Sequence, residues 1–146
     1  MPNTYMKGAR IMRMGFTFNV IEKSLEGLAK RFRATSGNLA NANTPGYARR
    51  NVSFENELRD VINSNRRLHM TTTNQGHIPS RPRAVADITP RETRARDDIY
   101  RLDGNSVDPE REMVILAETR MMYSAMTRYA ARRVSSLRTA ISGRSS

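Results

Sequence analysis

The chain has 146 residues, a formal net charge of +11 and no cysteine, which excludes disulfides and thiolate metal sites. Only 38% of its residues are hydrophobic and Trp is absent, so the apolar supply for a core is thin and partial reliance on neighbouring chains is favoured. The basic balance fits either nucleic-acid binding or pairing with acidic protein neighbours.

Residues 1–15 form a basic extension that carries Lys7, Arg10 and Arg13 and no acidic residue. The extension lacks the apolar core and the cleavage site of a secretory signal peptide. No stretch of the chain reaches the roughly 18 consecutive apolar residues of a membrane-spanning helix. A Sec-type signal peptide is therefore not expected.

Residues 16–47 are predicted to form an N-terminal helix that ends in a tight turn, with Asn19 as a candidate N-cap. Apolar residues recur at alternating spacings of three and four, interrupted by Thr35, which is typical of a helix that packs against another helix. This stripe comprises Phe18, Ile21, Leu25, Leu28, Phe32, Leu39 and Ala42. Proline followed by glycine then predicts a type II turn, because glycine accepts a positive φ. The turn residues are Asn43, Thr44, Pro45, Gly46 and Tyr47.

Residues 48–107 are predicted to be an irregular middle segment, extended or partly ordered. Residues 51–55 alternate like a short strand, but the apolar residues from Phe54 to Ile62 fit one or two helical turns equally well, so both structures remain open there. Three prolines lie within residues 71–98, which are expected to be extended or mobile.

Residues 108–146 are predicted to form a long C-terminal helix. Asp108 is a favourable N-cap and Pro109 suits the first helical position. Glu110 and Glu112 are expected to complement the positive end of the helix dipole. Two apolar stripes lie on different faces of this helix. The first comprises Met113, Leu116, Tyr123, Ala130, Val134, Leu137 and Ile141, and the second comprises Ile115, Met122, Met126 and Tyr129.

The two terminal helices give a mainly α fold class. We expect the first stripe to pack against the N-terminal helix within one subunit, as an antiparallel coiled-coil-like pair. The second stripe then needs another cover, which is either the middle segment or other subunits. We favour other subunits, because unbranched Met side chains adapt to non-identical neighbours.

No motif for catalysis or metal binding is present in the sequence, so we expect no enzyme activity, no metal and no cofactor. His69 and His77 lack the spacing of a helical metal pair, and there is no phosphate-binding glycine loop. Basic residues are spread along the chain rather than gathered on one recognition element. This spread weakens the alternative of a basic helical nucleic-acid-binding protein.

Residues 41–47, with the sequence NANTPGY after Leu39 and Ala40, resemble the N-terminal signature of the flagellar axial proteins of the rod, hook and hook-associated structures. The overall resemblance covers residues 16–141 and is greatest to the proximal rod members. The segments that carry the proximal rod resemblance are residues 52–58, 70–73, 76–78, 102–108 and 132–141.

The resemblance implies a structural subunit of the proximal rod of the bacterial flagellar basal body, which polymerises through helix packing into a hollow shaft that transmits torque. It implies several partners: copies of the chain itself, other rod proteins, the basal-body adaptor and membrane-ring protein, and the flagellar export apparatus. It also implies a periplasmic location reached without a cleaved signal peptide, and no nucleic-acid partner.

Overall fold

The structure, a computed structural model, describes residues 4–64, 84–95 and 102–143, with side chains described from residue 15 onward in the first helix. It is mainly helical, as the sequence predicts. The elements in chain order are α1 (Thr4–Ala40), β1 (Arg49–Ser53), α2 (Glu55–Ser64), the 3-10 helix η1 (Val85–Asp87), β2 (Arg91–Ala95) and α3 (Pro109–Ser142).

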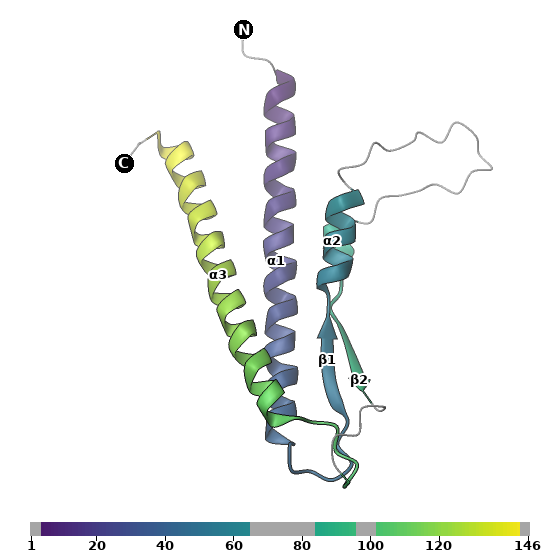
Figure 1. Ribbon diagram of the computed structural model, residues 1–146. Coiled ribbons are helices and arrows are strands. Elements are labelled where there is room, and N and C mark those ends of the chain that lie inside the picture. The colour runs from purple at the N-terminus through teal and green to yellow at the C-terminus, as the bar shows by residue number, and fades with distance from the viewer. Residues whose placement is uncertain (1–3, 65–83, 96–101, 144–146) are drawn as a thin grey trace, which may run out of the picture.

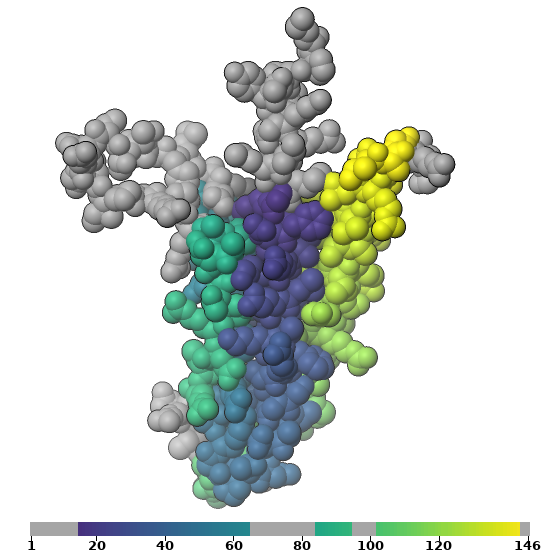
Figure 2. All heavy atoms as spheres, turned by 180° about the vertical axis from the view of Figure 1, so that it is seen from behind, coloured from purple at the N-terminus to yellow at the C-terminus, as the bar shows by residue number. Residues whose placement is uncertain are grey.

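The central element of the molecule is α1, which lies between α3 on one side and α2 with the two strands on the other (Figure 1). From the turn at the end of α1, α3 runs back along α1, so the start of α1 and the end of α3 lie at the same end of the molecule. The axes of α1 and α3 diverge towards that end. Seen from behind, α1 also lies between α3 and the middle segment and remains visible between them (Figure 2). Each side of α1 therefore has its own packing partner.

α1 starts earlier than predicted. The helix begins at Thr4 and so includes most of the basic extension at residues 1–15, which was predicted to precede the helix. The candidate N-cap Asn19 consequently lies inside the helix, where its backbone neighbours are already helical. A capping signature marks a helix start only where helical backbone does not continue before it.

The middle segment is more regular than predicted. β1 and β2 pair antiparallel with Arg49 opposite Ala95 and Ser53 opposite Arg91. Val52 is buried between exposed neighbours, as expected of a strand on a surface, and α2 follows directly. Both structures that the sequence left open thus occur in succession, a strand and then a helix.

The buried stripe of α1 agrees with the predicted one at alternate positions only. Ile21 and Leu28 of α1 and Ala42 in the turn after it are buried, but Leu25 is only partly buried and Phe32 is exposed. The other buried residues are Ser24, Gly27, Ala34, Thr35 and Asn38. Small and polar side chains occupy these positions because α1 is approached closely from two sides, and the larger apolar side chains are displaced towards solvent.

Two clusters of buried apolar residues stabilise the fold. One contains Leu28, Ala34, Val52 and Phe54, with Met126 of α3 packed against it. The other lies towards the far end of α2 and contains Leu58, Val61, Val85 and Ile88, with Phe16, Val20 and Ile62 at its edge. The first cluster joins α1, α3 and the middle segment.

Gly27 is required where the Phe54 ring packs against α1. A methyl group added at Gly27 would lie 2.6 Å from Cγ and Cδ1 of Phe54. We expect Gly27→Ala to destabilise the fold by about 1–3 kcal/mol through overpacking, although Ala is the better helix former by about 1 kcal/mol. Urea unfolding followed by circular dichroism measures the change.

Gly15 provides the matched control on the same helix, because an added methyl group there meets no atom within 4 Å. Gly15→Ala should therefore stabilise the chain by up to about 1 kcal/mol. In a Gly27→Ala, Phe54→Leu double variant, a smaller side chain replaces the Phe54 ring, which should restore part of the lost stability. Equal stability of Gly27→Ala and the parent chain would contradict the close contact.

Candidate functional site

The turn after α1 has the geometry that its sequence requires. Gly46 has φ of 69°, the positive value that favours glycine. The Tyr47 amide donates to the Thr44 carbonyl at 3.3 Å. The Gly46 amide donates to the Asp103 carbonyl at 3.0 Å, which ties this turn to the segment that leads into α3.

Asn105 closes the end of α1 from that same segment. Its side-chain amide donates to the carbonyls of Asn41, Ala42 and Thr44 at 3.0, 3.1 and 2.8 Å. Its Oδ1 accepts from the Val107 amide at 2.7 Å. All three carbonyls lie just after α1, where the helical hydrogen-bond pattern has ended. Asn105, which is 0% exposed, supplies their partner.

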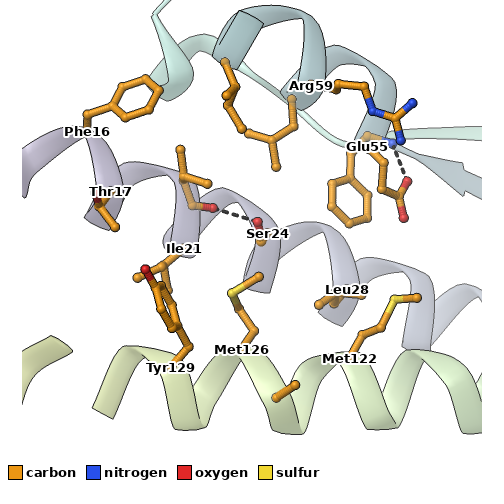
Figure 3. A pocket seen from close by; sticks show the side chains of 15 residues that line it. Phe16, Thr17, Ile21, Ser24, Leu28, Glu55, Arg59, Met122, Met126 and Tyr129 are labelled. Atoms are coloured by element: carbon orange, nitrogen blue, oxygen red, sulfur yellow. Dashed lines mark hydrogen bonds between the residues drawn. The ribbon is translucent and has the colours of Figure 1, made fainter. Parts of the chain in front are cut away.

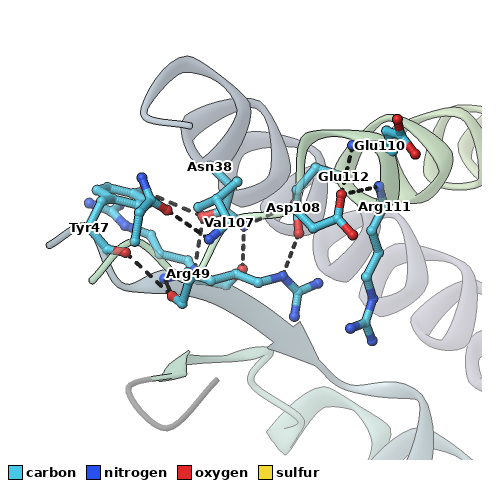
Figure 4. Close-up of polar contacts among 11 residues, drawn as sticks. Asn38, Tyr47, Arg49, Val107, Asp108, Glu110, Arg111 and Glu112 are labelled. Atoms are coloured by element: carbon cyan, nitrogen blue, oxygen red, sulfur yellow. Dashed lines mark hydrogen bonds and ion pairs between the residues drawn. The ribbon is translucent and has the colours of Figure 1, made fainter. Parts of the chain in front are cut away.

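Asn38 and Glu112 form a second buried polar contact, which joins α1, β1 and α3 (Figure 4). The Asn38 side-chain amide donates to Glu112 Oε2 at 3.0 Å and to the Arg50 carbonyl at 2.8 Å, and Asn38 Oδ1 accepts from the Arg50 amide at 2.9 Å. Glu112 also forms an ion pair with Arg49. Both Asn38 and Glu112 are 0% exposed.

This network gives Glu112 a role that its position in the sequence does not reveal, because a glutamate in the first turn of a helix predicts only an interaction with the helix dipole. The N-cap prediction is confirmed: Asp108 accepts from the amides of Glu110 and Arg111 at 3.0 and 3.2 Å, and Pro109 begins the helix. The turn end of the molecule is thus fixed by hydrogen bonds and one buried ion pair.

An open apolar groove of about 750 Å³ lies farther from the turn, with α1 as its floor and α2 and α3 as its walls (Figure 3). Met122, Met126 and Tyr129 extend from α3 towards α1. The other lining residues are Phe16, Thr17, Val20, Ile21, Ser24, Leu28, Phe54, Glu55, Leu58, Arg59, Ile62 and Ala125. Met122 is 51% exposed and Tyr129 is 48% exposed, so the single chain leaves much of this apolar surface uncovered.

The structure turns the second stripe of α3 towards α1, which differs from the predicted pairing. Met126 packs against the first core cluster, Met122 and Tyr129 line the groove, and Ile115 is partly buried. The members of the first stripe that remain exposed are Met113, Tyr123, Val134 and Ile141, whereas Leu116, Ala130 and Leu137 are partly buried.

The physical reason for this rotation of α3 lies in two buried polar residues. Glu112 and Thr119 are seven residues apart, and Met126 follows at the same interval. Residues at this interval lie on one face of a helix. The hydrogen bonds of Glu112 turn that face towards α1, and the second stripe lies beside it.

The described residues contain no group of three side chains that could hold a metal ion; His69 and His77 lie outside this part of the chain. No helix in the described ranges is both long and apolar enough to cross a membrane. The candidate site therefore rests on two features of the described residues, the polar network at the turn and the apolar groove.

Comparison with known proteins gives one consistent result, although no family model matches the chain. The chain is similar to the flagellar basal body rod protein FlgB of Proteus mirabilis (strain HI4320), with 32% identity over 115 residues, 75% of this chain and 81% of that protein. FlgB of Escherichia coli (strain K12) is 33% identical over 106 residues, 70% of this chain and 75% of that protein. FlgB of Bacillus subtilis (strain 168) is 29% identical over 127 residues, 87% of this chain and 94% of that protein.

Proposed function

The chain belongs to the FlgB family of flagellar basal body rod proteins, and from this we propose that it is a structural subunit of the proximal rod. In this proposal, subunits polymerise through helix packing into a hollow shaft that transmits torque. Its partners are copies of itself, other rod proteins, and the adaptor and ring proteins at the base. The subunit reaches the periplasmic rod through the flagellar export apparatus, without a cleaved signal peptide.

The observation that carries the proposal is the uncovered apolar groove. Burying a large apolar side chain contributes about 1.5–3 kcal/mol, and exposed apolar patches of this kind mark interaction sites. We assign Met122 and Tyr129 to contacts between subunits. Met126 lies deeper in the same groove and contributes both to the core of the single chain and to the surface that a neighbour covers.

The polar network supports the same role in a different way. It holds α1 and α3 together at the turn end with no contribution from a neighbour. The groove can therefore be presented in a defined shape before assembly, which lowers the ordering cost of binding. Exposed residues of the first α3 stripe, such as Tyr123 and Val134, are available for further neighbours in the shaft.

Met122→Asp tests the assignment, because Met122 is half exposed and touches the groove rather than the buried clusters. We expect its free energy of unfolding to change by less than about 0.5 kcal/mol, as for ordinary surface substitutions. Incorporation into purified basal bodies should fall at least tenfold, because a desolvated carboxylate opposes burial against a neighbour. Swimming in soft agar should be lost in parallel.

Ser135→Asp is the matched control, since it adds the same carboxylate to an exposed position of α3 outside the groove. We expect it to assemble normally. Loss of assembly in both variants would show that a carboxylate anywhere on α3 is harmful and would count against the groove. Normal incorporation of Met122→Asp would remove Met122 from the contact between subunits.

A further inference from the structure

The groove between α1, α2 and α3 combines an apolar floor with a cationic rim. Its charged lining residues are Glu55 and Arg59, and the Glu55 carboxylate is already paired with Arg31 at 2.5 Å. Arg31 also lies over the Phe54 ring, with its guanidinium 5.1 Å from the ring centroid. The acidic side chain at the groove is therefore neutralised within the chain.

The α3 side of the groove is bordered by three arginines, Arg128, Arg132 and Arg133, all of them exposed. Arg128 follows the groove-lining residue Ala125 by three positions, and Arg132 and Arg133 follow Tyr129 by three and four. Side chains three or four residues apart lie on the same side of a helix. Arg128 thus lies beside the groove wall, and Arg132 and Arg133 continue that wall by one turn.

In the part of α3 that borders the groove, the charged side chains are all positive. After Glu118 the helix has five arginines and no carboxylate up to its end at Ser142. An exposed cationic rim opposes a like-charged neighbour and favours an acidic one, and such charges set partner choice and encounter rate more than affinity. The apolar floor supplies affinity, and the rim decides which helix is accepted.

A second copy of this chain is a poor occupant by the same criterion. Its α1 carries seven basic and two acidic residues, and its α3 carries six basic and three acidic residues. Either helix would bring further positive charge to the rim. The acidic helix α2 has only ten residues and already buries Leu58 and Val61 in its own chain.

We propose that the groove binds an amphipathic helix from a different, acidic protein. The apolar face of that helix covers Met122, Met126 and Tyr129, and its flanking carboxylates pair with Arg128, Arg132 and Arg133. This inference rests on the proposed function only in treating the groove as a contact between subunits. It adds that the subunit seated in the groove is not a copy of this chain.

The test uses the full chain and three fluorescent helical peptides of equal length. The first carries an apolar stripe flanked by Glu, the second carries the same stripe flanked by Lys, and the third has the composition of the first with its apolar residues scrambled. Fluorescence anisotropy should show the acidic amphipathic peptide binding at least tenfold more tightly than either of the others. The advantage over the Lys peptide should fall as salt is raised, because salt screens exposed charges.

Two double variants of equal net charge separate the rim from general positive charge. Arg132→Glu with Arg133→Glu should abolish or reverse the preference for the acidic peptide. Arg120→Glu with Arg138→Glu changes arginines of the same helix that do not follow the groove-lining residues by one turn, and it should retain the preference. Equal binding of the acidic and scrambled peptides, or equal loss in both variants, would overturn the inference in favour of non-specific attraction.

The remaining outcome is self-association of the chain through the groove. Analytical ultracentrifugation of the chain with and without the acidic peptide measures its oligomeric state. Oligomers that resist the peptide, and that Met122→Asp dissolves, would assign the groove to a second copy and overturn the inference. Recovery of the parent chain in basal bodies, together with peptide binding that ignores charge, would leave the proposed function standing while the inference fails. Absence of the parent chain from basal bodies, together with peptide binding that depends on charge, would contradict the rod assignment alone.

Discussion

Replacement of Glu112 by Leu is expected to destabilise the fold by about 3 kcal/mol or more. Removing one partner of a buried ion pair leaves the other charge uncompensated, which typically costs about 3–5 kcal/mol. Here the loss leaves the Arg49 guanidinium without its carboxylate and removes one acceptor of the Asn38 side chain. Urea unfolding monitored by circular dichroism gives the change in free energy.

Two further variants show whether the ion pair is the cause. Glu118→Leu changes an exposed glutamate of the same helix and should alter stability by less than about 0.5 kcal/mol. An Arg49→Met, Glu112→Leu double variant should regain at least half of the loss, because apolar residues of similar volume can replace a buried pair at little cost. A double variant no more stable than Glu112→Leu would assign the loss to Asn38 or to packing.

The helices themselves were predictable because their signals are local and repeated. Asp108 and Pro109 mark the start of α3 by their own chemistry, and the proline and glycine after α1 predict a turn in which Gly46 has positive φ. The resemblance of residues 41–47 to the axial proteins added the family, which the curated relatives support.

The faces of the helices were not predictable from apolar spacing. Apolar spacing takes no account of polar side chains, whereas the buried face of α3 begins with Glu112 and Thr119. A buried glutamate is stable only because Arg49 and Asn38 converge on it from other elements, and no local pattern reveals partners 63 and 74 residues away. The rotation of α3 follows from these long-range contacts.

The pairing of strands in the middle segment could not be predicted from the sequence for a related reason. β1 has five residues, and its partner β2 begins 38 residues after β1 ends. A short strand has a weak local signal, and its pairing is a property of the folded chain rather than of the segment. The contact of Phe54 with Gly27 could not be predicted from the local sequence either. A glycine in the middle of a predicted helix indicates only that another part of the chain packs closely against the helix there.

The polar and apolar parts of the molecule are separated along α1. Near the turn, the hydrogen bonds of Asn38, Asn105 and Glu112 join the end of α1 to the start of α3 and the segment that leads into it. Farther along, α3 faces α1 with apolar side chains, of which Met126 packs against the core and Met122 is left half exposed by the single chain. A chain built in this way has one end fixed by its own hydrogen bonds and, in the function proposed above, one end that neighbouring subunits complete.

The second large effect is expected at Asn105, which is the hydrogen-bond donor to three carbonyls of the turn just after α1. In Asn105→Asp the donor is lost and a negative charge faces the carbonyls of Asn41, Ala42 and Thr44 in a buried position. Burial of an unpaired charge and loss of the donors should together cost about 3 kcal/mol or more at pH 7. Urea unfolding should also show a smaller loss, about 1–3 kcal/mol, for Asn105→Ala, which removes the donor without adding charge.

The difference between the two Asn105 variants should depend on pH, and its sign follows from proton linkage. The introduced carboxyl holds its proton more tightly in the folded chain, where the charge is buried and the protonated form can donate to one carbonyl, than in the unfolded chain. The folded state therefore binds more protons, and the stability of Asn105→Asp relative to Asn105→Ala should rise as the pH falls from 7 towards 4. A constant difference across this range would mean that the carboxylate escapes to solvent, and that the three carbonyls do not hold the side chain at position 105 in place.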